Sequence, residues 1–122
     1  MRIEARNLLL AYAGLVALWQ IVGVGLIASG GRSPGPSASI LGAILAVAMG
    51  SGIVFTFGRW PRICLALAGF SGLLAGQALY NAWMGDASLW PSAWTRGLGA
   101  AINAIGLAGA LLALQSFLVQ KS

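Results

Sequence analysis

Residues 8–28 read LLLAYAGLVALWQIVGVGLIA, a run that contains one glutamine and no charged residue. Because a helix needs about 20 predominantly apolar residues to cross the ~30 Å hydrocarbon core of a bilayer, this stretch is long enough to span a membrane. Three further charge-free stretches follow it, residues 40–57, 63–84 and 97–119. We therefore predict an all-α integral membrane protein, a bundle of four transmembrane helices joined by short loops.

The composition supports the same fold class. Of the 122 residues, 59% are hydrophobic and only 7% are charged, whereas a soluble domain carries about 25% charged residues. Backbone groups in hydrocarbon must be hydrogen-bonded within the protein, which leaves helices or a closed barrel, and the four runs lack the strict alternation of barrel strands. Because the connections are short, we expect residues 1–122 to form a single transmembrane domain.

The basic residues lie at the ends of the four stretches and indicate the topology. Five of them would share one side of the membrane and two the other, namely Arg2, Arg6, Arg59, Arg62 and Lys121 against Arg32 and Arg96. The positive-inside rule then predicts cytoplasmic amino and carboxyl termini and a location in the cytoplasmic (inner) membrane. Despite the net charge of +5, no basic face with interleaved aromatic residues exists, so we expect no nucleic-acid partner.

The side chains offer little chemistry for catalysis or metal binding. The chain has no histidine and one cysteine, Cys64, so the commonest general base and the usual imidazole and thiolate ligand sets are missing. Glu4 and Asp86 would lie on opposite sides of the membrane and cannot form an acid/base pair. We predict no cofactor, no metal and no enzymatic activity.

Small residues recur at four-residue spacing within the stretches. Apolar burial cannot drive helix association in lipid, whereas close backbone approach at small residues can. The glycines expected at helix contacts are Gly42, Gly50, Gly69, Gly72, Gly76, Gly99 and Gly106. These faces join either helices of one chain or helices of several chains; we favour packing within the chain, because four spans offer a partner for each face.

Three amides within the spans are the candidates for a polar site. Gln77 and Asn81 share one face of the third stretch, and Asn103 lies on the small-residue face of the fourth. An amide that faces lipid is costly, so we expect all three to point toward other helices and to approach one another in the outer half of the bundle. They would form interhelical hydrogen bonds or line a path for a small solute or lipid.

A short basic turn joins the second and third stretches. Trp60 lies between Arg59 and Arg62, so its ring can occupy the headgroup layer while both guanidinium groups reach lipid phosphates. Ordinary membrane anchoring and a specific anionic-lipid site both fit this pattern. Membrane lipids are therefore expected partners of the chain.

The two outer loops differ in composition. Residues 29–39 are rich in Gly, Pro and Ser and are expected to be mobile at the outer surface, with Ser39 capping the second helix. Residues 85–96 contain Trp90 and Trp94, which predicts a short segment that lies in the outer membrane interface.

Three functions remain open. The abundance of small-residue faces favours a non-catalytic accessory or scaffold subunit that packs against itself or a larger membrane complex. The alternatives are a channel, carrier or lipid-handling protein for an uncharged or amphipathic substrate, and a pore-forming or immunity-type membrane protein. The size and number of spans resemble those of the small multidrug resistance exporters, but that family depends on an acidic residue within the first helix, and here Glu4 lies before it.

Overall fold

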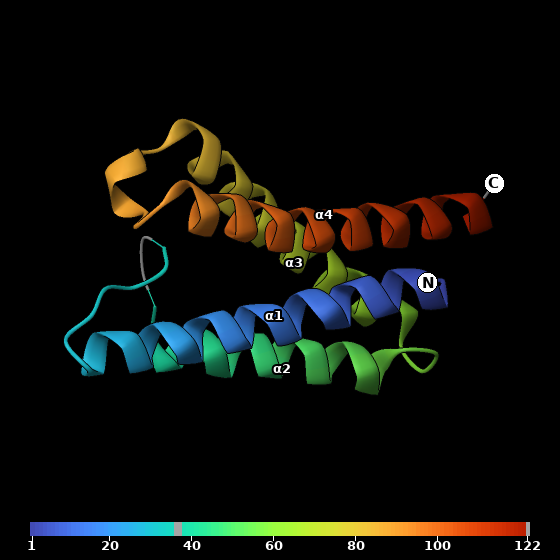
Figure 1. Ribbon diagram of the computed structural model, residues 1–122. Helices are drawn as coiled ribbons and strands as arrows, with labels where there is room; N and C mark the ends of the chain where they lie inside the picture. Colours follow the sequence, from blue (N-terminus) through green and yellow to red (C-terminus); the bar gives the residue numbers. More distant parts are fainter. Residues whose placement is uncertain (36–37, 122) are drawn as a thin grey trace.

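The computed structural model describes residues 1–35 and 38–121, and over these residues the chain is all-α with no strand. The elements are α1 (Ile3–Ala28), α2 (Ile40–Thr56), α3 (Pro61–Met84), the short 3-10 helix η1 (Ala87–Leu89) and α4 (Ala93–Lys121), drawn in Figure 1. Each stretch expected to span the membrane is a helix. By length and composition α1, α3 and α4 can cross a membrane, while α2 is apolar but shorter; these helices indicate a multi-pass membrane protein.

Local signals set the ends of α2. At its start the Ser39 hydroxyl accepts a hydrogen bond from the Gly42 N–H at 2.9 Å, which confirms the expected cap. After Thr56 the chain turns through Gly58, whose φ of +76° suits a residue without a side chain. Pro61 then begins α3 at a position where its missing N–H costs nothing. These signals limit α2 to 17 residues.

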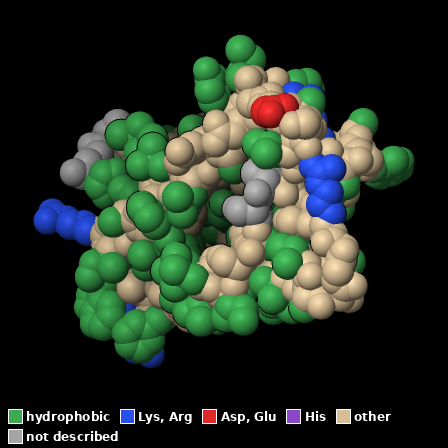
Figure 2. Space-filling view, turned by 90° about the vertical axis from the view of Figure 1, so that its left-hand side faces the viewer, with side chains coloured by type: hydrophobic (Ala, Val, Ile, Leu, Met, Phe, Trp, Pro, Cys, Tyr) green, Lys and Arg blue, Asp and Glu red, His purple; other side chains and the backbone are tan. Residues whose placement is uncertain are grey.

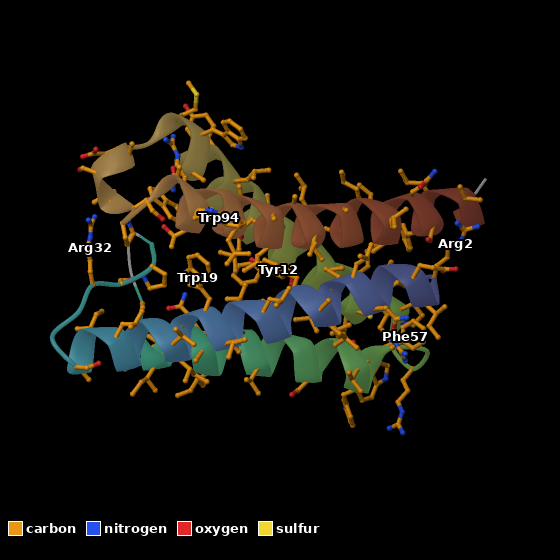
Figure 3. All side chains as sticks on the ribbon, viewed as in Figure 1. Arg2, Tyr12, Trp19, Arg32, Phe57 and Trp94 are labelled. Carbon is orange, nitrogen blue, oxygen red and sulfur yellow. The ribbon has the colours of Figure 1, made fainter. Side chains whose placement is uncertain are left out.

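The helices alternate in direction, so both termini lie at one end of the bundle with the α2–α3 turn (Figure 1). Figure 3 shows Arg2 and Phe57 at this end and Arg32 at the other. The guanidinium carbon of Arg6 lies 4.9 Å from the centroid of the Phe57 ring, which joins the start of α1 to the end of α2. The structure thus places the N-terminal arginines beside the turn, as the charge pattern predicts.

Small residues fill the interior and large apolar residues face outward. Alanine supplies most of the buried hydrophobic residues, including Ala68, Ala75 and Ala113, each 0% exposed. Large side chains such as Leu73, which is 74% exposed, lie on the outside of every helix. Hydrophobic side chains cover much of the end view in Figure 2 as well. This arrangement suits lipid as the solvent, because lipid tails solvate the large side chains and close helix approach supplies the packing.

Most of the predicted glycines lie at contacts within the chain. An added Cβ would meet the atoms of a neighbouring helix or loop at Gly42 (Gln20, 2.9 Å), Gly50 (Ala13, 3.1 Å), Gly72 (Ala110, 2.5 Å), Gly76 (Leu107, 3.9 Å), Gly99 (Trp90, 3.0 Å) and Gly106 (Tyr12, 2.5 Å). At Gly69 nothing lies within 4 Å, so this glycine makes no such contact. Gly52 and Gly109, which were not singled out, meet Leu67 and Leu9 at 3.0 Å.

Two glycines on α3 provide a matched test of this packing. Gly72→Ala places its Cβ 2.5 Å from the Ala110 Cβ, where no flexible side-chain end can yield, whereas Gly69→Ala enters open space. We expect Gly72→Ala to lower the free energy of unfolding by about 1–3 kcal/mol and Gly69→Ala to leave it unchanged or raise it slightly, because alanine favours the helix over glycine. Unfolding of the reconstituted protein with a denaturing detergent measures both. Equal stability of the two variants would contradict the α3–α4 contact.

Candidate functional site

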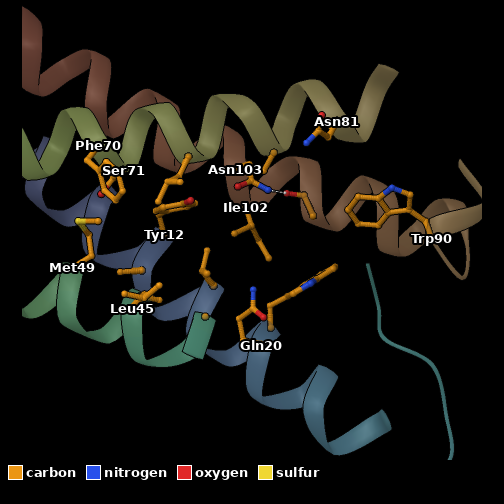
Figure 4. Close-up of a pocket in the computed structure, with 18 residues that line it drawn as sticks. Tyr12, Gln20, Leu45, Met49, Phe70, Ser71, Asn81, Trp90, Ile102 and Asn103 are labelled. Atoms are coloured by element: carbon orange, nitrogen blue, oxygen red, sulfur yellow. Dashed lines mark hydrogen bonds between the residues drawn. The ribbon is translucent and has the colours of Figure 1, made fainter. Parts of the chain in front are cut away.

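A partly open cavity of about 510 Å³ lies among the four helices (Figure 4). Among the described residues, no charged side chain lines it. The lining residues come from all four helices and from the loop before α4: Tyr12, Ala13, Val16, Trp19, Gln20, Gly42, Leu45, Ala46, Met49, Phe70, Ser71, Leu74, Ala78, Asn81, Trp90, Gly99, Ile102 and Asn103. The volume falls within the range of roughly 300–1,000 Å³ that is common for small-molecule sites.

The cavity opens sideways between α2 and α3. Its exposed lining residues all belong to these two helices, namely Leu45 on α2 and Phe70, Leu74 and Asn81 on α3. The lining residues of α1 and α4, such as Tyr12, are buried or half-buried and form the floor. Because three of the four rim residues are apolar, the opening presents a surface suited to lipid tails.

The packing of α3 explains this opening. Of the neighbouring helix pairs, α2 and α3 have the smallest contact. They meet near their shared turn, where Gly52 lies against Leu67. Figure 1 shows α3 diverging from α2 toward its far end. There α3 is held to α4, since the Arg96 guanidinium donates hydrogen bonds to the carbonyl oxygens of Ala82 and Trp83.

Two tryptophans close the end of the cavity nearest the loop before α4. Trp19 and Trp90 make an edge-to-face contact with ring centroids 6.4 Å apart. The Trp90 ring turns inward against Gly99 and Gly35, where an added Cβ would lie only 3.0 Å from it. Trp94, 85% exposed, does face outward. Sequence reasoning missed this inward position because it depends on two glycines that are distant in the chain.

The described part of the loop between α1 and α2 packs against the bundle. The Arg32 side chain donates a hydrogen bond to the Ser88 carbonyl oxygen in η1. At the end of the loop the Ser39 N–H donates to Oε1 of Gln20 on α1 at 2.8 Å. Residues 36–37, part of the stretch expected to be mobile, lie outside the described residues. The loop therefore lies beside the tryptophan-lined end of the cavity and contacts the lining residue Gln20.

The structure brings two of the three predicted amides to the cavity. Asn81 lies on its rim and Asn103 in its wall. Asn103 donates from Nδ2 to the Gly99 carbonyl oxygen of its own helix at 2.8 Å, as the dashed line in Figure 4 shows, so this donor is used within α4. Gln77 is exposed and is not among the lining residues.

Ser71 and Tyr12 are polar residues of the site that sequence reasoning did not single out. Ser71 is 1% exposed, and within the described part of the chain its hydroxyl has no hydrogen-bond partner. Other helical hydroxyls donate to the carbonyl four residues earlier, as Thr56 does to Gly52 at 2.7 Å. A signal existed: Ser71, Leu74, Ala78 and Asn81 recur at three- and four-residue spacing, so counting back from Asn81 along one helix face leads to Ser71.

The basic turn is the second candidate site from the sequence. Trp60 is exposed and its ring lies 5.3 Å from that of Phe55. Arg59 extends over the same Phe55 ring at 5.3 Å, and Arg62 is exposed. Arg59 thus lies beside an aromatic pair at the end of α2, and both arginines are exposed, an arrangement compatible with lipid headgroups.

The acidic residues take no part in the cavity. Asp86 lies in the outer loop, where the Ser88 N–H bonds its carboxylate at 2.9 Å and lowers its pKa. Among the described residues no group of three or more His, Cys, Asp or Glu side chains could hold a metal ion. The polar chemistry of the site therefore consists of hydroxyl, amide and indole groups.

No family model, curated protein or solved structure matches this chain. Its function is therefore argued from the geometry of the cavity.

The Arg96 hydrogen bonds hold the α3 end of the cavity in place. We expect Arg96→Gln to lower the free energy of unfolding by about 1 kcal/mol, because it removes a charged donor from carbonyls at a helix C-terminus. Arg32→Gln is the matched control, since its one described bond joins two exposed loops. Thermal unfolding in nanodiscs measures both variants. If Arg32→Gln lowers the stability as much as Arg96→Gln does, the Arg96 hydrogen bonds have no special role in holding α3.

Proposed function

We propose that the protein is a non-catalytic carrier or lipid-handling protein that binds an uncharged amphipathic molecule from the membrane in its central cavity. The observation that carries the proposal is the sideways opening between α2 and α3, whose rim residues Leu45, Phe70 and Leu74 are apolar and exposed. A molecule dissolved in the bilayer would reach the cavity through this opening without crossing water.

The proposal includes a topology of four spans with cytoplasmic termini. α2 has 17 residues, about 25 Å at ~1.5 Å per residue. That length falls short of the ~30 Å core, and local thinning of the bilayer accommodates such a difference at modest cost. The N-terminal arginines and the basic turn at one end support the cytoplasmic assignment of that end in the inner membrane.

The lining of the cavity supports an uncharged ligand. A buried charge without a partner is strongly unfavourable in a medium of low dielectric constant. Among the 18 lining residues none can neutralise a charge, whereas Tyr12, Gln20, Asn81 and Asn103 offer hydrogen bonds. The apolar surface between these groups would contact the hydrocarbon part of the ligand.

Filling the cavity tests the proposal. Ala78 lines the cavity on α3, whereas Ala66 on the same helix is exposed and lies outside it. We expect wild type and Ala66→Leu, extracted into nanodiscs with their native lipids, to retain an apolar molecule enriched over bulk lipid. Ala78→Leu should retain at least about tenfold less of this molecule than wild type does, because the larger side chain occupies the site. Mass spectrometry of the extracts measures retention, and equal retention by the two variants would overturn the proposal.

An accessory or scaffold subunit is the second candidate function. The observation that favours it is Gly69, an exposed helix glycine with open space around it, which leaves room for a helix of another chain. The contacts of Gly72 and Gly106 within the chain weaken this alternative, because they use most of the small-residue surface internally.

A bulky residue at Gly69 tests the second candidate. If another helix packs there, Gly69→Leu should abolish a higher oligomer or the copurification of a partner in mild detergent, whereas Ala66→Leu should leave either intact. Size-exclusion chromatography with light scattering gives the mass of each complex. An unchanged mass for Gly69→Leu would remove this function.

A further inference from the structure

One hydroxyl in the wall of the cavity lacks a hydrogen-bond partner among the described residues. Ser71 is 1% exposed, and its Oγ has no hydrogen bond within the described structure. Such a group is costly to bury, because its hydrogen bonds to water are lost and nothing replaces them. A ligand atom that accepts a hydrogen bond from Ser71 would remove this cost.

Further polar groups face the same space from other helices. Figure 4 shows Tyr12 of α1 and Asn103 of α4 around the space that Ser71 borders. The Tyr12 hydroxyl can donate and accept, and Oδ1 of Asn103 can accept even though its Nδ2 is bonded within α4. Hydroxyls and an amide from three helices thus border one space with no charged side chain in its lining.

The opening to lipid lies beside these polar groups. Phe70 is adjacent to Ser71 in sequence and Leu74 is one helical turn away, and both are exposed rim residues. A head group bonded to Ser71 would therefore leave its acyl chains at the rim, where they can remain in the bilayer. The cavity has to hold only the head group, which about 510 Å³ permits.

The polar groups continue outward from Ser71. Asn81, on the same face of α3, lies about 15 Å further along the helix at ~1.5 Å per residue, and both residues line the cavity. Gln20 and the indole groups of Trp19 and Trp90 lie in the same lining. A head group could exchange hydrogen bonds along this row while its chains follow the opening between α2 and α3.

From these observations we infer that the ligand is a neutral glycerolipid, such as a diacylglycerol, whose uncharged head group enters the cavity and bonds to Ser71 while its acyl chains remain in the bilayer. This inference rests on the proposed function and narrows its ligand to one class. The hydroxyl and ester oxygens of a diacylglycerol match the donors and acceptors of the cavity. A phosphate-bearing head group would bring a charge that the lining cannot neutralise.

Lipids with the same chains and different head groups test the inference. The protein is reconstituted in phosphatidylcholine nanodiscs that contain a small fraction of either dioleoylglycerol or dioleoyl phosphatidic acid, each with a photoreactive group in one chain. We expect the diacylglycerol to label wild type at least about tenfold more than the phosphatidic acid, with the label mapping to α2 and α3. Equal or greater labelling by phosphatidic acid would overturn the inference.

Two serine variants separate a role in binding from a role in folding. Ser71→Ala should lower diacylglycerol labelling by roughly three- to tenfold, the loss expected for one hydrogen bond. Without diacylglycerol, its thermal midpoint should be unchanged or higher, because the variant removes an unpaired buried hydroxyl. Ser51→Ala, on the exposed side of α2 outside the cavity, is the control and should match wild type. If the diacylglycerol labels Ser71→Ala as strongly as it labels wild type, the inference is overturned.

The Ala78→Leu variant distinguishes the two levels of the proposal. If neither probe labels wild type but Ala78→Leu still loses its native apolar molecule, the cavity has another ligand class and only this inference fails. If Ala78→Leu retains that molecule as Ala66→Leu does, the proposed function fails as well.

Discussion

Close approach of helix backbones at small residues is the interaction on which the rest of this structure depends. In lipid the outer surface gains nothing from burial, so helices associate where van der Waals contact is dense. Gly72 against Ala110 joins α3 to α4, and Gly106 against Tyr12 joins α4 to α1. Gly50 against Ala13 joins α1 to α2 in the same way. These contacts fix three of the four sides of the bundle.

The fourth side lacks an equivalent contact over most of its length, and the cavity is the consequence. α2 and α3 meet at Gly52 and Leu67 near their turn, while Arg96 holds the far end of α3 against α4. A helix fixed at both ends to different neighbours cannot follow α2, so a space remains between them. Leu45 and Leu74 line this space from α2 and α3. Lipid tails can therefore occupy the volume that the side chains do not fill.

Much of the fold followed from the sequence, because its determinants are local. Uncharged runs of sufficient length predict the helices, and Ser39, Gly58 and Pro61 set their ends within a few residues. The site was less accessible to such reasoning. Asn81 and Asn103 drew attention as amides in apolar helices and do line the cavity, whereas Gln77 is exposed and is not among the lining residues. The inward turn of Trp90 depends on Gly35 and Gly99, a contact between distant segments that no periodicity reveals.

Ser71 shows why an isolated polar residue in a membrane helix is hard to interpret from sequence. A serine hydroxyl usually satisfies itself by bonding the carbonyl four residues earlier, as Ser116 does with Leu112 at 2.8 Å. Its presence alone therefore predicts nothing. In this bundle the hydroxyl is buried in the cavity wall and has no hydrogen-bond partner among the described residues, which is why a ligand is proposed to supply one. In the proposed complex the uncharged lining of the cavity would favour a ligand with hydroxyl or ester groups over one with a phosphate.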